Sequence, residues 1–147
     1  NNGGDGLFVC WRVKHGLFEG NVVRGNKGAG ISIGHKDTDN LFRDNVITGN
    51  SGAGVLFREE SEPMGAHRNV FEGNRILDNG LAGGGPPGAC VIIRGHHHDL
   101  VFRKNTIGHS KATVAGVGIH SAGHTPGLQN VNNQFPNLKT PTRLDGR

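Results

Sequence analysis

The chain has 147 residues, a formal net charge of +4 and a hydrophobic content of 33%, which is thin for a single compact core and favours an elongated domain. Its 26 glycines lack the every-third spacing of collagen, and its basic residues form no run, so a collagen fold and nucleic-acid binding are disfavoured. No apolar stretch approaches the roughly 20 residues that a bilayer requires, and no secretory leader opens the sequence, so we expect no membrane span.

An internal repeat dominates the sequence. Short strands are expected at residues 7–9, 31–33, 55–57, 91–93 and 117–119, often after Gly-x-Gly. Four of them are followed by the pattern F-x-x-N-x-[VI]-x-x-[NS], which begins at Phe18, Phe42, Phe71 and Phe102. The Phe follows the first strand residue by 11 positions in coils one, two and four and by 16 in coil three. Coil three therefore carries a five-residue insertion in an otherwise constant repeat.

The repeat predicts three columns of inward-facing side chains, because alternate residues of a strand face opposite sides. The first column is formed by the first and third residues of each short strand, beginning with Leu7 and Val9 and ending with Val117 and Ile119. The other two columns are Phe18, Phe42, Phe71, Phe102 and Val23, Ile47, Ile76, Ile107. We therefore predict an all-β fold, a right-handed single-stranded parallel β-helix of about five three-sheet coils over residues 1–133.

Three further columns, two of asparagine and one of charged residues, are expected to be structural. The asparagines should stand where the chain turns between sheets, since Asn tolerates left-handed backbone angles and bonds nearby backbone groups. The residues after each Phe alternate in sign, as a register-fixing charge ladder would. The members are Asn21, Asn45, Asn74 and Asn105, then Asn26, Asn50 and Asn79, and for the charges Glu19, Arg43, Glu72 and Arg103.

The two cysteines should be free thiols. Cys10 and Cys90 lie three coils apart, and a rise of about 4.8 Å per coil would separate them by roughly 14 Å. A disulfide allows a Cα separation of only about 7 Å.

Two long excursions border coil three, at residues 58–66 and 80–89, and they are the expected walls of any groove. The last coil is predicted to depart from the repeat, with Leu128 in the Phe column and Val131 in the Asn column. Residues 134–147 lack the repeat and are predicted to be a tail over the end of the stack. The sequence does not begin with Met, so we expect a segment of a longer protein, whose N-terminal end continues into further coils or self-associates.

The N-x-[VI]-x-x-N…G-[IV] repeat over residues 5–133 resembles that of right-handed parallel β-helix proteins related to pectin lyase. The motif is specific for fold rather than for function. The resemblance implies relatives that are polysaccharide lyases, hydrolases, uronate epimerases, phage tailspike modules and periplasmic accessory proteins of copper-enzyme maturation. It implies an extracellular or periplasmic location and a polysaccharide partner, with substrate lying along one sheet and its bordering turns.

The outward face of the first strands and the turn after them is the expected site. Arg58, Arg94 and His120 should form one row there, able to bind the carboxylates of an acidic sugar or to assist proton abstraction. Glu59 and Asp37 are the carboxylates expected to meet across neighbouring coils. These five are the candidate catalytic residues, and the candidate substrate-binding residues are Ser32, His35, Lys36 and His96.

Three functions stay open at this stage. The first is a carbohydrate-associated module acting on an anionic polysaccharide, and the second is a non-catalytic adhesive or structural solenoid that binds glycan or protein. The third is a periplasmic metal-enzyme maturation factor, which depends on His96, His98 and His120 as ligands of a transition metal. No metal site or cofactor is predicted firmly, although Ca²⁺ remains open if several oxygen ligands converge.

Overall fold

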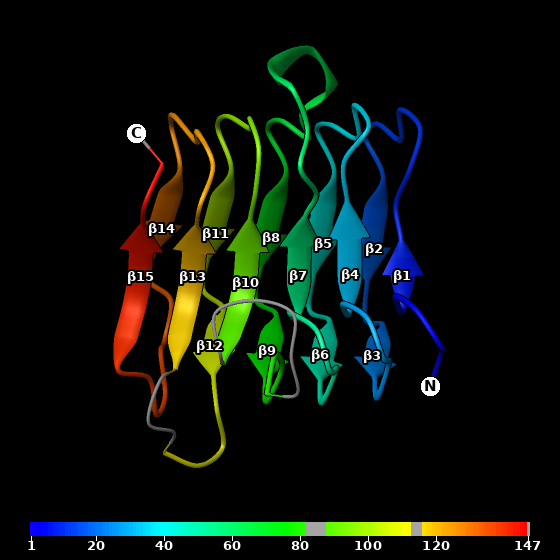
Figure 1. Cartoon of the computed structure of the whole chain (residues 1–147). Coiled ribbons are helices and arrows are strands. Elements are labelled where there is room, and N and C mark those ends of the chain that lie inside the picture. Colours follow the sequence, from blue (N-terminus) through cyan, green and yellow to red (C-terminus); the bar gives the residue numbers. More distant parts are fainter. Residues whose placement is uncertain (82–87, 113–115, 147) are drawn as a thin grey trace.

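The structure, a computed structural model, describes residues 1–81, 88–112 and 116–146. Figure 1 shows a parallel β-helix in which strands from successive coils lie side by side in three sheets. The first sheet has the order β1-β4-β7-β10-β13-β15, the second β14-β11-β8-β5-β2 and the third β12-β9-β6-β3. The predicted fold class is therefore confirmed as a three-sheet parallel solenoid.

The strands are short. The first sheet contains β1 (Leu7–Phe8), β4 (Ile31–Ile33), β7 (Val55–Phe57), β10 (Ala89–Ile93), β13 (Val117–Ser121) and β15 (Thr140–Leu144). The second contains β2 (Leu17–Glu19), β5 (Leu41–Arg43), β8 (Val70–Glu72), β11 (Val101–Arg103) and β14 (Gln129–Val131). The third contains β3 (Val22–Arg24), β6 (Val46–Thr48), β9 (Arg75–Leu77) and β12 (Thr106–Gly108).

The phenylalanines stack in single file, as predicted. Phe18, Phe42, Phe71 and Phe102 lie in register along the second sheet, with ring centroids 4.6, 4.4 and 5.1 Å apart in sequence order. The third sheet aligns the aliphatic column in the same way, and its central members are fully buried. Like therefore packs on like in these two columns, and the stacking excludes water from the interior.

The register of the last coil is two residues away from the prediction. Ile119, not Val117, pairs with Val91, and Asn130, not Leu128, stands beside Phe102. Counting 11 residues from Ile119 leads to Asn130, so the last coil obeys the same spacing as the others. The error arose because Val117 and Ile119 are both apolar and two apart, so alternation alone cannot choose between them.

The asparagine columns are structural and bond nearby backbone groups, as predicted, but these asparagines are not themselves the left-handed residues. The left-handed residue is the one before each Asn, for example Gly20 with φ 67° and Asp44 with φ 53°. The Asn side chain turns inward and bonds the preceding coil: Asn45 Oδ1 accepts the backbone N–H of Asn21 at 2.9 Å, and Asn45 Nδ2 donates to the Phe18 carbonyl at 2.9 Å. The ladder continues through Asn74 and Asn105 to Asn133, and a second one joins Asn26, Asn50 and Asn79.

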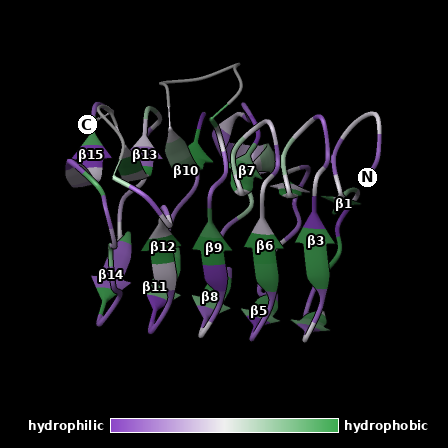
Figure 2. Cartoon of the chain, turned by 90° about the horizontal axis from the view of Figure 1, so that it is seen from below, coloured by the Kyte–Doolittle hydropathy of each residue, from purple (hydrophilic) through white to green (hydrophobic). Residues whose placement is uncertain are grey.

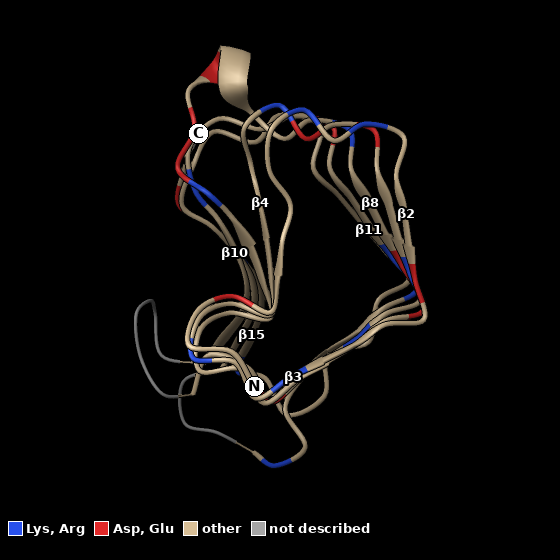
Figure 3. Ribbon diagram, turned by 90° about the vertical axis from the view of Figure 1, so that its right-hand side faces the viewer, with Lys and Arg blue, Asp and Glu red and all other residues tan. Residues whose placement is uncertain are grey.

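Charges lie mainly at the corners between sheets, as the view along the stack in Figure 3 shows. The predicted charge ladder is confirmed. Arg43 lies 2.7 Å from Glu19, and Arg103 donates to Glu72, all in partly exposed positions. Exposed pairs of this kind contribute about 0.2–1 kcal/mol each, so they favour the register more than they stabilise the fold.

The excursion at 58–66 leaves the coil as a loop with a short 3-10 helix, η1 (Glu62–Met64), and projects beyond the turns at the top of Figure 1. Most of the second predicted excursion, residues 82–87, lies outside the described residues. The expected tail contains β15, which pairs in parallel with β13 and extends the first sheet. The proposed domain boundary at residue 133 stays a prediction.

The two ends of the stack differ in character. Figure 2 shows β3 and β6 of the third sheet as largely hydrophobic, whereas β14 at the C-terminal end of the second sheet is more hydrophilic. At the N-terminal coil Leu17 and Val22 are 56% and 64% exposed.

Both cysteines are free thiols, as expected. Within the described part of the chain, no helix has the length and apolar character to cross a membrane.

Candidate functional site

Arg58 is the centre of a polar cluster at the carboxyl ends of β1, β4 and β7. Its Nη1 donates to the Ser32 hydroxyl at 3.0 Å, and its Nη2 donates to the Val9 carbonyl at 2.9 Å. The guanidinium carbon lies 4.3 Å from the centroid of the Phe8 ring. With 15% of its side chain exposed, Arg58 is a positioned donor that joins three consecutive coils.

Two carboxylates flank this guanidinium. Asp37 is fully buried, accepts the backbone N–H of Val13 at 2.9 Å and lies 3.7 Å from Arg58 Nη2. Burial raises the pKa of the Asp37 carboxyl, against the lowering effect of its backbone hydrogen bonds and of Arg58. The second carboxylate is Glu60, 3.9 Å from Arg58 Nε, and it takes the place in which we expected Glu59, which is exposed.

His35 completes the cluster. Its Nδ1 lies 3.2 Å from Arg58 Nη2 and 3.1 Å from Cys10 Sγ, while its backbone N–H donates to Glu60. Arginine can only donate, so Nδ1 is an acceptor and the ring proton belongs on Nε2, which lies 3.6 Å from Glu60. The Trp11 ring stacks on His35 with a centroid distance of 5.4 Å. We call this group the arginine cluster: Cys10, Ser32, His35, Asp37, Arg58 and Glu60.

Arg94 and Lys36 adjoin the arginine cluster along the backbone. Arg94 follows Arg58 in the next coil, as predicted, because its backbone N–H donates to the Phe57 carbonyl at 3.1 Å. Lys36 is half-buried, and its backbone N–H donates to the Met64 carbonyl at 2.9 Å, which ties the 58–66 excursion to the preceding coil. Arg58 and Arg94 therefore lie in adjacent coils of the first sheet, as the repeat predicted.

The predicted row of Arg58, Arg94 and His120 is wrong at its third member. Because of the two-residue shift in the last coil, His120 pairs with Ile92 and is 6% exposed. Its Nε2 lies 2.7 Å from an Asp145 carboxylate oxygen, and its Nδ1 is buried without a hydrogen-bond partner among the described residues. His120 therefore belongs to the contact between β13 and the segment after β15.

A second polar site lies beyond the 58–66 excursion, where turns from several coils meet. It is a pocket of about 330 Å³, which we call the histidine pocket. Its lining residues are Glu62, His67, His96, His97, His98, Asp99, His124, Pro126 and Gly127. His96, a predicted substrate-binding residue, lines this pocket, with its ring centroid 5.7 Å from that of His124, while its backbone N–H donates to the Glu60 carbonyl at 2.8 Å.

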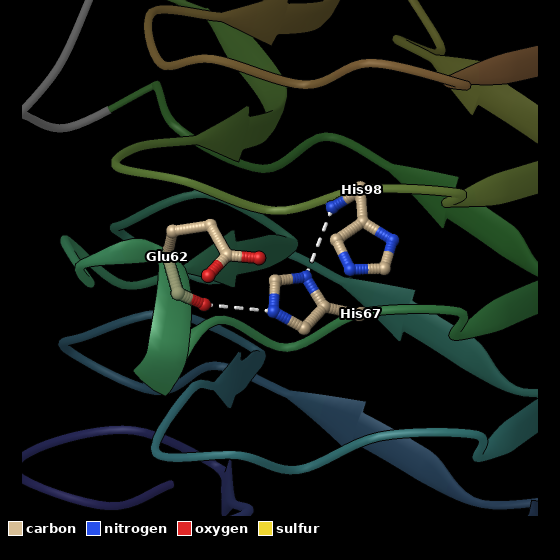
Figure 4. A group of neighbouring side chains, drawn as sticks. All are labelled: Glu62, His67 and His98. Atoms are coloured by element: carbon tan, nitrogen blue, oxygen red, sulfur yellow. Dashed lines mark hydrogen bonds between the residues drawn. The ribbon is translucent and has the colours of Figure 1, made fainter.

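The side chains that come together in the histidine pocket differ from the metal ligands predicted from the sequence. Of the three histidines considered there, His98 lines the pocket together with His96, and His120 does not. The side chains close enough to share an ion are Glu62, His67 and His98, whose donor atoms all lie within 4.8 Å of one another (Figure 4). His67 was missed although it stands four residues before Phe71, as His98 stands four residues before Phe102, so the repeat did contain a signal.

Other functional candidates were also missed. Trp11 and Phe8 are 67% and 55% exposed, and both border the arginine cluster. The sequence did contain a signal, because Trp11 is the one tryptophan of the chain and stands in a turn. No signal distinguished Glu60 from Glu59.

The sequence model of one protein family, described as the right handed beta helix region, matches residues 1–135. That description agrees with the predicted hand of the solenoid. The comparison with curated proteins and the comparison with solved structures found no match.

Proposed function

Because the chain belongs to the family of right-handed β-helix proteins, we propose that it is a carbohydrate-associated module that binds an anionic polysaccharide beside the arginine cluster. The observation that carries this proposal is the pair of exposed aromatic rings, Trp11 and Phe8, next to buried polar groups. Rigid aromatic faces supply apolar contact area at low entropic cost, and neighbouring polar groups orient a ligand. Sugar rings offer one apolar face and several hydroxyls, which suits this combination.

The charges near the aromatic rings favour an anionic polymer. Arg12 and Lys14 are exposed in the turn that contains Trp11, and the Arg12 backbone N–H donates to the His35 carbonyl at 3.1 Å. Lys36 lies in the next turn. Cationic side chains around an aromatic platform would attract uronate carboxylates and make the binding depend on salt.

Binding is supported better than catalysis. Arg58 donates to Ser32, Val9 and His35 and lies close to two carboxylates, so its guanidinium is already engaged as a hydrogen-bond donor. A guanidinium so engaged is a poor proton acceptor, and His120, the other proposed acid or base, lies elsewhere. The remaining candidate for proton transfer is His35, whose Nε2 faces Glu60 at 3.6 Å.

The test is retention of the full chain by polygalacturonate and alginate in affinity electrophoresis, with dextran as the neutral polymer. We expect retention by the acidic polymers, weakened about tenfold in Trp11→Ala, which corresponds to about 1.4 kcal/mol. Leu17→Ala, in the same coil and 56% exposed, is the matched control and should bind as the native chain does. Equal binding by Trp11→Ala, or no retention by either acidic polymer, would refute the proposal.

The same polymers test the catalytic alternative. Release of unsaturated uronate products, followed by absorbance, would establish a lyase. In that case His35→Asn should abolish product release while polymer retention persists, because Trp11, Arg12 and Lys14 remain.

A further inference from the structure

The histidine pocket brings together side chains from separate coils. Glu62 comes from η1 in the 58–66 excursion, His67 from the turn that precedes β8, and His98 from the corresponding turn one coil later. His67 and His98 are stacked, with ring centroids 3.7 Å apart and planes inclined by 16°. Figure 4 shows the Glu62 carboxylate directed toward the two rings.

We propose that Glu62, His67 and His98 bind a transition-metal ion, with Zn²⁺ as the best match. Two imidazoles and one carboxylate form a ligand set that zinc uses in three-ligand sites with an open coordination position. The donor atoms lie within 4.8 Å of one another, so an ion about 2.0–2.2 Å from each requires the side chains to close in and the two stacked rings to turn until their nitrogens converge. Ca²⁺ and Mg²⁺ are poor candidates, because they select oxygen ligands and this group offers one carboxylate.

Both imidazoles have the second hydrogen bond that is common in metal-binding histidines. His98 Nδ1 lies 2.8 Å from a carboxylate oxygen of Asp99, an arrangement that leaves His98 Nε2 as the donor atom for a metal. His67 Nε2 lies 2.9 Å from the Glu62 carbonyl, which leaves His67 Nδ1. That Nδ1 accepts the backbone N–H of His98 at 3.1 Å, so the metal replaces one hydrogen bond when it binds.

The residues around the proposed ion would leave one of its coordination positions open, as in catalytic metal sites, rather than enclose it, as in structural ones. The exposed His96 and His124 also line the pocket and are available as further ligands or as groups facing a bound molecule. His67 is 9% exposed, whereas Glu62 is exposed at the surface, so the ion would have an entry path. The open position would face the pocket of about 330 Å³.

The experiment uses the whole chain, freed of metal by a chelator. Zn²⁺ is titrated in by calorimetry, and Co²⁺ is added in a separate experiment, because its visible absorption bands report coordination number and ligand type. We expect one ion per chain and a raised Tm at saturating Zn²⁺, because the ion binds the folded state. Glu62→Gln and His98→Asn should each weaken binding at least tenfold.

The controls separate a built site from general binding by histidines. His15→Asn replaces an exposed histidine at a left-handed position that Asn tolerates, and it should bind Zn²⁺ like the native chain. Glu62→Gln replaces one exposed carboxylate by an amide of the same size, so its Tm without metal should stay unchanged even if His67 variants fold poorly. Unchanged affinity in Glu62→Gln and His98→Asn, or equal losses in His15→Asn, would overturn the proposal.

Discussion

Arg58 illustrates how a single residue can have a role that its predicted outward position does not reveal. The sequence placed it in an outward column, and an outward arginine next to another arginine is a natural ligand for carboxylates. In the structure its side chain folds over Phe8 and reaches back two coils to the Val9 carbonyl. It therefore holds the edge of the first sheet and contacts His35. Arg12 and Lys14 are exposed and Lys36 is half-buried, and these are the cations that we propose for ligand binding.

The two cysteines should differ sharply in reactivity. Cys90 is fully buried, and burial raises the pKa of its thiol to about 12, so the reactive thiolate is scarce at neutral pH. Cys10 is partly exposed beside His35. In the folded chain we expect a thiol reagent to label Cys10 and spare Cys90, with both labelled in denaturant.

Mass spectrometry of the labelled chain checks this prediction. Cys10→Ser should reduce native labelling nearly to zero, whereas Cys90→Ala should leave it at one label per chain. Rapid native labelling of Cys90 would mean that the interior between β10 and β12 opens more readily than its burial indicates.

At the scale of elements, the asparagine ladders explain why such short strands stay in register. Each internal Asn offers both an acceptor and a donor to neighbouring coils, so every turn is tied to the one above and the one below. A third ladder, from Asn40 to Asn69, was missed in the sequence although both residues stand two positions before the column Phe. Its recurrence at a fixed offset was the available signal.

Asn74→Ala should destabilise the fold strongly. Asn74 is 1% exposed, accepts the backbone N–H of Asn45 and donates to the Phe42 carbonyl and to Asn105, so its loss leaves buried polar groups unpaired. We expect a loss of about 2–4 kcal/mol in the free energy of unfolding, measured by urea denaturation.

Asn21→Ala is the matched control at the end of the same ladder. Asn21 is exposed and its side chain donates only to Asn45 among the described residues, so its removal should cost less than about 1 kcal/mol. Similar losses in the two variants would mean that the ladder is not the main source of the stability.

At the scale of the whole molecule, the N-terminal coil is less well covered than the coils that follow. Leu17 and Val22 are largely exposed, whereas their counterparts in the next coil, Leu41 and Val46, are half-buried. Unpaired strand groups and apolar side chains at the end of a sheet stack favour association with another chain. Self-association through this coil accordingly stays our prediction.

Light scattering over a range of concentrations tests that association. We expect the mass to exceed the 15.6 kDa of one chain at high concentration. Val22→Lys should return it to the monomer value, whereas Leu144→Lys, an exposed leucine at the opposite end of the stack, should not. A monomer mass at all concentrations would contradict the prediction.

The sequence by itself determined the solenoid, its three interior columns and the register of four coils. It could do so because each column recurs with a nearly constant spacing, and because stacking identical residues leaves few alternatives for burying them. Only the tertiary structure decided the register of the last coil, the choice of Glu60 over Glu59, and the approach of Glu62 to His67 and His98. These depend on the path of turns and excursions, where the backbone follows no period, so the position of a side chain there is set by contacts between coils rather than by spacing along the chain.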